Sequence, residues 1–294
     1  MPKDKKNNKQ EKFKTQDGAF AYLRSLATMS EPEINMAEAA LALGYIFLPG
    51  ISIDRYRFCI AKLEEEVKTT YIRKMQLDKQ DSIYNRVTTL REVVYDNNEF
   101  KGDINNFENL DNINFIRVLE TKKGIPVAMG ILLLHLAEKI GWECSGVSFP
   151  GHFLLRMDYE GERAIIDPFA RAKFMEAHDL RDLIKSILGN SMELSHSFYS
   201  SVSKRDVLLR MQNNMKARFI EEADYKRAIL AIEGVEAFYP EEYRVYLDKG
   251  VLYAKLRNCT KSVESLQHYI EKTPNQSEKR QAEVLLQEIK ATLG

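Results

Sequence analysis

GIPVAMGILLLHLAEKIGWECSGVSFPGHFLLRMDYEGERAIIDPF, residues 124–169, joins one apolar helix pattern to two short strand patterns. Pro126 is a favoured first residue of a helix, and Gly141 is a natural residue for its end. The apolar runs 153–155 and 164–166 predict two strands, joined by a polar turn. A helix followed by antiparallel strands indicates an α+β fold.

A histidine and an aspartate stand at the ends of these strands with the spacing of a thiol-acyltransferase triad. His152 follows the Pro150-Gly151 turn, and Asp167 ends the second run. Pairing of the strands should bring the two side chains together, so that the carboxylate orients the imidazole. The nucleophile should lie in the first turn of the preceding helix, where the dipole lowers a thiol pKa. That turn is PVAM, residues 126–129, and none of its side chains can attack a carbonyl.

The composition excludes several classes of protein. The chain has 294 residues, is 44% hydrophobic and 29% charged, and has a net charge of zero. This balance gives no reason to expect nucleic acid or an anionic membrane as a partner. The three cysteines, Cys59, Cys144 and Cys259, are far apart, which argues against a disulfide framework or a zinc site. The longest apolar run, 125–134, is too short to span a bilayer. We therefore expect a cytoplasmic protein without metal or other cofactors.

The chain divides into four predicted parts. Residues 1–16 are rich in lysine and lack an apolar segment, which is typical of a disordered basic tail rather than a secretory signal. Residues 17–98 form a helical N-terminal region, residues 99–200 the α+β core, and residues 204–294 a helical repeat. The helices predicted before the repeat cover residues 33–48, 53–75, 81–94, 114–120, 126–140 and 178–188.

An internal repeat with an offset of 34 residues marks the C-terminal part. The offset relates these pairs: Phe219 and Tyr253, Ala228 and Ser262, Ile232 and Leu266, Val235 and Tyr269, Pro240 and Pro274. The small, aromatic and proline positions match the tetratricopeptide pattern. The first unit departs from that pattern, since Lys216 replaces the glycine that the second unit has as Gly250. Two units and a terminal helix make a short array. Such an array either binds peptides or serves as a packing scaffold, and we favour the scaffold.

Six segments resemble a known family. In order, they are NEFKGDINNF (98–107), DNINFIRVLETKKGIPV (111–127), GVSFPGHFLLR (146–156), IIDPF (165–169), RMQNNMKARF (210–219) and DKGVLYAKL (248–256). Together they are similar to the SirB-like family of bacterial proteins, from about Glu33 to the C-terminus. That family has a divergent transglutaminase-like core followed by tetratricopeptide repeats. The resemblance implies a mostly helical α+β protein with a small papain-like core. It also implies a regulatory role, which is the family's association.

The resemblance also locates the missing nucleophile. Catalytic members of the wider transglutaminase-like superfamily open the core helix with a cysteine, about fifteen residues before the closing glycine. Pro126 holds that position here, fifteen residues before Gly141. SirB-like proteins generally lack the cysteine, and many have serines just downstream. Those positions are Ala128 and Gly130 in this chain, so the resemblance implies a core without a substitute hydroxyl.

The histidine and aspartate of the pattern match His152 and Asp167, for which two roles remain open. We favour a vestigial triad or a structural pair, and the alternative is a general base that activates water. Cys144 is a candidate displaced nucleophile, but it falls after the helix, which favours a packed apolar role. Arg156 lies on the same predicted strand face as His152. It can bind a carboxylate or phosphate in the cleft, or pair internally with Asp167 or Glu162.

The leading functional hypothesis is a non-catalytic interaction or regulatory protein. A protein or peptide partner would bind the repeat or the core cleft, and the sequence does not specify an oligomeric state. The alternative is a weak hydrolase or amidase that uses His152 and Asp167 on an acyl or amide substrate. The basic turn at residues 122–124 precedes a helix N-terminus, a setting that either binds an anion or is simply solvated.

Overall fold

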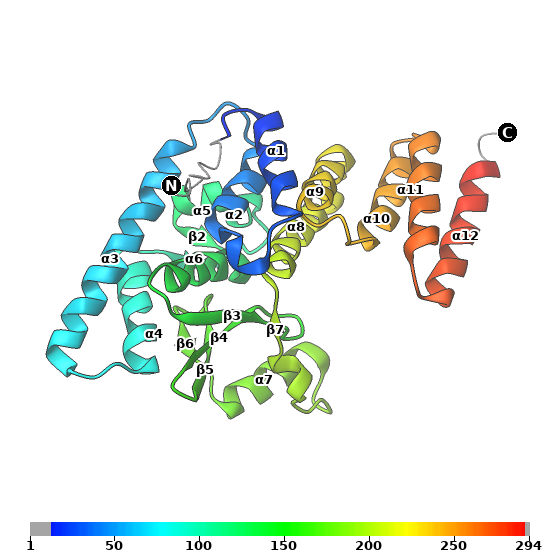
Figure 1. Cartoon of the computed structure of the whole chain (residues 1–294). Coiled ribbons are helices and arrows are strands. Elements are labelled where there is room, and N and C mark those ends of the chain that lie inside the picture. Colours follow the sequence, from blue (N-terminus) through cyan, green and yellow to red (C-terminus); the bar gives the residue numbers. More distant parts are fainter. Residues whose placement is uncertain (1–12, 292–294) are drawn as a thin grey trace, which may run out of the picture.

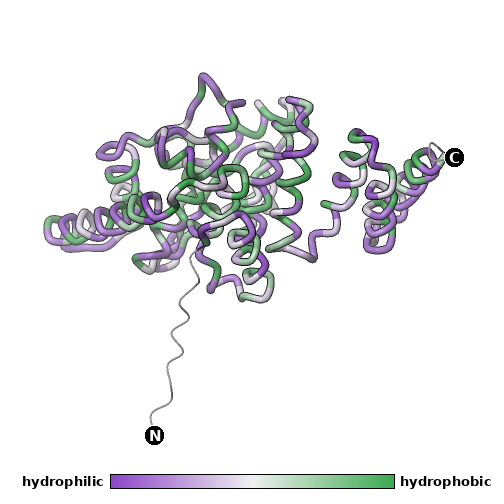
Figure 2. The backbone as a smooth tube through the Cα atoms, turned by 90° about the horizontal axis from the view of Figure 1, so that it is seen from above, coloured by the Kyte–Doolittle hydropathy of each residue, from purple (hydrophilic) through white to green (hydrophobic). Residues whose placement is uncertain are grey.

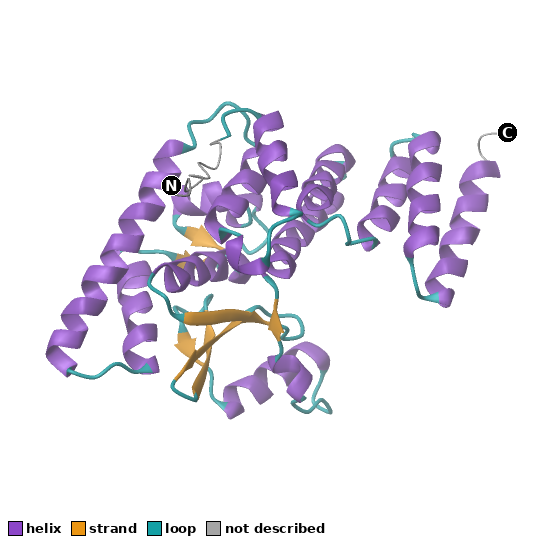
Figure 3. Ribbon diagram, viewed as in Figure 1, coloured by secondary structure: helices purple, strands orange, loops and turns teal. Residues whose placement is uncertain are grey.

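The computed structural model describes residues 13–291, so most of the predicted basic tail, residues 1–12, lies outside the described residues. The helices are α1 (Gln16–Leu26), α2 (Met36–Tyr45), α3 (Asp54–Asp78), α4 (Ile83–Arg91), α5 (Phe115–Thr121), α6 (Pro126–Lys139), α7 (Ala177–Leu188), α8 (Lys204–Glu221), α9 (Tyr225–Phe238), α10 (Arg244–Lys255), α11 (Cys259–Lys272) and α12 (Gln276–Ala291). The strands are β1 (Lys101–Gly102), β2 (Lys123–Gly124), β3 (Glu143–Val147), β4 (Leu154–Tyr159), β5 (Glu162–Asp167), β6 (Lys173–Phe174) and β7 (Ser201–Val202). The predicted class, mostly helical α+β, is confirmed (Figure 3).

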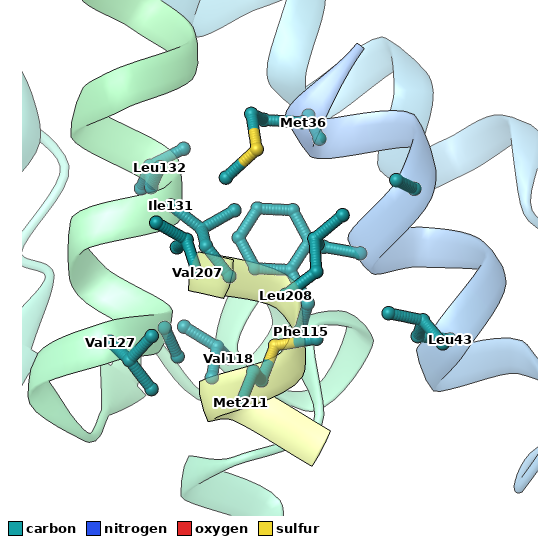
Figure 4. Close-up of a cluster of buried hydrophobic side chains, with 14 of the residues drawn as sticks. Met36, Leu43, Phe115, Val118, Val127, Ile131, Leu132, Val207, Leu208 and Met211 are labelled. Atoms are coloured by element: carbon teal, nitrogen blue, oxygen red, sulfur yellow. The ribbon is translucent and has the colours of Figure 1, made fainter. Parts of the chain in front are cut away.

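Helix α6 is the centre of the molecule. Its buried residues run without interruption from Pro126 to Ala137, because the segment is apolar on every side. Helices α2, α5 and α8 pack around it, and the side chains of all four helices meet in one cluster (Figure 4). The labelled members are Met36, Leu43, Phe115, Val118, Val127, Ile131, Leu132, Val207, Leu208 and Met211.

The core that contains this cluster is continuous from Phe13 to Tyr253. It therefore crosses the boundaries predicted near residues 98 and 204, and these boundaries do not coincide with a gap in the packing.

The larger sheet has the strand order β6-β5-β4-β3-β7, and all of its pairs are antiparallel. Because side chains alternate along a strand, its two faces have different neighbours. Leu155 belongs to the central core with α6, whereas Leu154 packs with Leu180 and Ile184 of α7. The sheet therefore lies between α6 and α7 (Figure 1). A smaller parallel pair, β1 and β2, precedes α6 and was not predicted from the sequence.

The tail predicted over residues 1–16 includes residues that belong to the fold. Residues 13–16 belong to the fold, because Phe13 is 3% exposed and packs against the rings of Tyr22 and Tyr45. The side chain of Thr15 then accepts a hydrogen bond from the Gly18 amide and caps α1. A single buried aromatic side chain thus anchors a segment whose lysine-rich composition predicts disorder.

Two predicted helices differ from the structure at one end for a reason that the structure shows. The helix predicted over residues 33–48 begins at Met36, because the Asn35 side chain accepts from the Glu38 amide and caps it. The helix predicted over residues 81–94 ends at Arg91 and continues as a π-helix, Glu92–Asn97. Hydrophobic periodicity gives no signal for such a widened turn.

The repeat is built from α8–α9 and α10–α11, with α12 at the end. Four of the five pairs related by the 34-residue offset are buried in both units, and the exposed pair is Pro240 and Pro274. In the second unit Gly250 lets the helices approach closely, since a Cβ there would lie 2.7 Å from Cγ of Leu266. Lys216, the equivalent in the first unit, instead reaches out to pair with Asp248 of the second unit.

The two units of the repeat differ in their surroundings. Helices α8 and α9 contribute to the central core and contact α2 and α1 respectively. Helices α11 and α12 form a separate small cluster around Leu266, Leu286 and Ile289. Helices α10–α12 extend to one side of the molecule, as the view from above also shows (Figure 2). Within residues 13–291, no helix combines the length and the apolar character needed to cross a bilayer.

Candidate functional site

The predicted contact between His152 and Asp167 is present. His152 Nε2 lies 3.1 Å from Asp167 Oδ2. His152 stands just before β4, and Asp167 is the last residue of β5. The antiparallel register, with Leu155 opposite Ile166, brings these two ends together. Both side chains are largely buried, with 18% of His152 and 11% of Asp167 exposed.

The Asp167 carboxylate is fixed by the backbone that follows it. Its Oδ1 accepts hydrogen bonds from the amides of Phe169, at 2.8 Å, and Ala170, at 3.3 Å. An ionised carboxylate only accepts hydrogen bonds, so in neutral His152 the proton is assigned to Nε2. The lone pair then lies on Nδ1. An imidazole with this free lone pair can accept a proton at Nδ1.

His152 opens onto a small pocket of about 70 Å³ at the N-terminus of α6. Pro126 is the first residue of that helix, and Ile125 before it offers no side-chain cap. The pocket is lined by Phe107, Ile125, Pro126, Val127, Gly151, His152, Phe153, Arg210 and Asn214. The place where a triad nucleophile would stand therefore faces the histidine, but no lining side chain there is nucleophilic.

Residues 128 and 130, the two positions after Pro126 that could carry a substitute hydroxyl, do not line this pocket. Ala128 is fully buried in the core. Gly130 packs against the ring of Phe153, where a Cβ would lie 2.3 Å from Cε1. A side chain at residue 130 requires that ring to move, so a serine hydroxyl cannot be added there without repacking β4 against α6.

Cys144 lies in a different part of the structure. It is on β3 and lines a cavity of about 340 Å³ together with Trp142, Lys204 and Val207. That cavity shares no lining residue with the His152 pocket. Burial raises the pKa of the Cys144 thiol to about 12, so very little thiolate is present near neutral pH.

The prediction that Arg156 shares a face with His152 is wrong. His152 precedes the first residue of β4 and follows a turn in which Gly151 has φ +66°. The alternation of side chains along the strand therefore does not apply to His152. Arg156 Nε instead donates to Asp158 Oδ2 at 2.7 Å, and not to Asp167 or Glu162. The Arg156 side chain lines another cavity, beside α7.

Two polar residues of the pocket, Arg210 and Asn214, were missed in the sequence. Both come from α8, where a spacing of four residues places them on one face. They belong to the segment RMQNNMKARF, which contributes to the family resemblance but carries no recognised motif. In the part of the chain that the structure describes, no three His, Cys, Asp or Glu side chains are grouped as a metal ion would require.

Two family models match this chain. The family model described as "Transglutaminase-like superfamily" matches residues 55–213, and a tetratricopeptide repeat model matches residues 215–287. The chain belongs to the transglutaminase-like superfamily. The span matched by the transglutaminase-like model is wider at both ends than the core predicted at residues 99–200, and it includes Arg210.

Relatives of this transglutaminase-like chain confirm the SirB-like family. A "UPF0162 protein" of Vibrio cholerae is 26% identical over 243 residues, which cover 82% of this chain and 87% of the relative. "Protein SirB1" of Salmonella typhimurium is 26% identical over 159 residues, which cover 54% of this chain and 59% of the relative. A solved structure of menin aligns with a TM-score of 0.37 at 10% identity, covering 88% of this chain and 70% of that chain.

Proposed function

We propose that this transglutaminase-like protein is a non-catalytic interaction or regulatory module of the cytoplasm. One observation carries the proposal: the pocket that faces His152 presents Pro126 where a nucleophile is required. The neighbouring small residues are packed inside the core. Cys144, the thiol closest to His152 in sequence, lies in another cavity and carries a raised pKa.

The C-terminal repeat supports an interaction role. Tetratricopeptide repeats generally mediate contacts between proteins. Here α8 and α9 pack against the central core, and α10 adds Val245, Leu252 and Tyr253 to it, whereas α11 and α12 have a cluster of their own and extend to one side. We infer that α8 and α9 serve as a scaffold and that α10–α12, or the core cleft, contact a protein or peptide partner. An odd number of well separated cysteines favours a reducing compartment such as the cytoplasm.

A turnover assay tests the absence of catalysis. Purified full-length protein is incubated with a panel of acyl esters and amides, alongside the variants His152→Ala and Asp167→Asn. We expect all three proteins to release product at the same background rate. Turnover by the wild-type protein that is lost in both variants would overturn the proposal.

A weak hydrolase is the second candidate. The observation in its favour is the intact pair, with Nε2 of His152 on Asp167 and Nδ1 directed away from the carboxylate. This pair can activate a water molecule, although acid–base catalysis alone contributes only about 10²- to 10⁴-fold. The same assay separates the two functions, since only a hydrolase depends on His152.

A further inference from the structure

Arg210 lines the His152 pocket and has no anionic partner within the described part of the chain. Among residues 13–291, its guanidinium has no hydrogen bond or ion pair, and its Cζ lies over the Phe153 ring, 5.6 Å from the ring centre. Burial lowers the pKa of Arg210, and no carboxylate offsets this effect. Two other arginines of the same helix are paired: Arg205 with Glu31, and Arg218 with Glu221. A partly desolvated charge that lacks a partner points to a ligand of opposite charge.

The pocket offers further hydrogen-bond donors to an anion. Helix α6 is 14 residues long, and Ile125 leaves the amides of its first turn without a side-chain cap. Val127 of this first turn and Arg210 of α8 both line the pocket. The positive end of the helix dipole and the guanidinium therefore face the same space.

The size and the rim of the pocket narrow the class of anion. A volume of about 70 Å³ admits one small planar group, and the guanidinium fork matches the two oxygens of a carboxylate. Exposed apolar side chains lie beside the opening. Phe107 lines the pocket and is 41% exposed. Ile187 is 37% exposed and packs against Gly151. Apolar surface around a charged pocket suits a carboxylate attached to an apolar group.

We propose that the pocket between Arg210, His152 and the N-terminus of α6 binds the carboxylate of a ligand whose attached group is apolar. The ligand is either a free small carboxylate or the C-terminus of a peptide. This inference rests on the proposed non-catalytic function, because it assigns the position of the missing nucleophile to binding. The segment RMQNNMKARF thereby gains a role, since it supplies Arg210.

A titration of the full-length, isotope-labelled protein tests the site. The ligands are N-acetyl-leucine, its neutral amide and inorganic phosphate, and the readout is the amide resonance of Val127. We expect saturable shifts with N-acetyl-leucine and none with the neutral amide. Arg210→Gln should weaken binding at least about tenfold, because it removes a charge-assisted hydrogen bond. Arg218→Gln, which changes the same charge two turns along the same helix, should bind as the wild type does.

The ligand comparison does not depend on the variants. If Arg210→Gln does not fold, equal binding of N-acetyl-leucine and its amide to the wild-type protein still overturns the site. Absence of a saturable shift, or tighter binding of phosphate, also overturns it. A tripeptide that ends in leucine with a free carboxylate identifies the source. Tighter binding than N-acetyl-leucine supports a peptide C-terminus, and equal binding supports a small carboxylate.

N-acetyl-leucine methyl ester separates this inference from the proposed function. An ester that stays intact while the carboxylate binds supports both. Hydrolysis of the ester that depends on His152 overturns the non-catalytic function and leaves the carboxylate site standing. Failure of the carboxylate to bind, with the ester intact, overturns the site alone.

Discussion

Pro126 combines a structural advantage with the loss of a reactive group. Its ring fixes φ near the helical value, and it lacks an amide hydrogen that the first turn of α6 could not satisfy. Pro126 is therefore a favourable first residue for the central helix, but it occupies the position where a triad would need a thiol. His152 and Asp167 keep their contact because the register of β4 and β5 sets it, independently of residue 126.

Pro126→Cys should therefore create a reactive thiol. A cysteine at this helix N-terminus beside His152 is expected to have a pKa lowered into the range of about 3.5 to 7.5. We expect iodoacetamide to label it within minutes at pH 7, measured by peptide mass spectrometry. Cys144 is the internal reference: burial raises its pKa to about 12. Its thiolate fraction, and hence its labelling, should rise about tenfold for each pH unit up to that value.

The control for this variant is Pro126→Cys combined with His152→Ala. Labelling of residue 126 should slow in the double variant, because the imidazolium that stabilises the thiolate is gone. Equal labelling in both variants, or a rate no faster than that of Cys144, would contradict the view that the triad geometry is retained.

Helix α8 joins three parts of the fold at its N-terminus. The Lys204 amide donates to Glu31 Oε2 at 2.7 Å, and Lys204 Nζ contacts Glu138 of α6 at 2.5 Å. Arg205 donates to the carbonyls of Leu26 and Met29, both at 2.6 Å, at the end of α1. The repeat is thus tied to the N-terminal helices by hydrogen bonds as well as by the apolar core.

Arg205→Ala should destabilise the protein by about 2–3 kcal/mol, because two carbonyls and one carboxylate lose a largely buried donor. Urea unfolding followed by circular dichroism measures the change. The matched control is Arg73→Ala, which removes an arginine that is 57% exposed and paired with Glu92. It should cost less than about 1 kcal/mol. Similar losses in both variants would show that the Arg205 contacts do not stabilise the fold.

The molecule as a whole has one large core and a small C-terminal extension. Helix α8 places Val207, Leu208 and Met211 in the middle of the core, beside α6 (Figure 4). Helices α11 and α12 rely on their own cluster. Removal of the C-terminal part should therefore have very different effects depending on where the chain is cut.

A protein truncated after Pro240 should still unfold cooperatively, with a midpoint roughly 5–10 °C lower than that of the full chain. It loses α10–α12 but keeps α8 and α9. A protein truncated after Ser203 should show no cooperative thermal transition by circular dichroism, because it exposes the apolar surface that α8 covers. If the second truncation melted as the first does, α8 would not be part of the core.

Much of the fold could be predicted from local patterns. The apolar run that begins at Pro126, the strands that flank the polar turn and the 34-residue repeat each have a period that maps onto one element. The predictions failed where a single contact overrides composition. Phe13 anchors the end of a lysine-rich tail, and Asn35 fixes the start of α2. Arg156 was assigned to the wrong face because His152 lies outside the strand.

The amino-acid order alone determines the mostly helical α+β class, the spacing of His152 and Asp167, and the absence of a nucleophile at Pro126. These features depend on the hydrophobic period and on the identity of particular residues, both of which can be read from short stretches of sequence. The tertiary structure alone brings Arg210 to the same pocket as His152, 58 positions earlier in the chain. It also places Cys144 in another cavity. Such contacts depend on how α8 and the sheet pack against α6, and no local pattern encodes the distance between elements that are far apart in sequence.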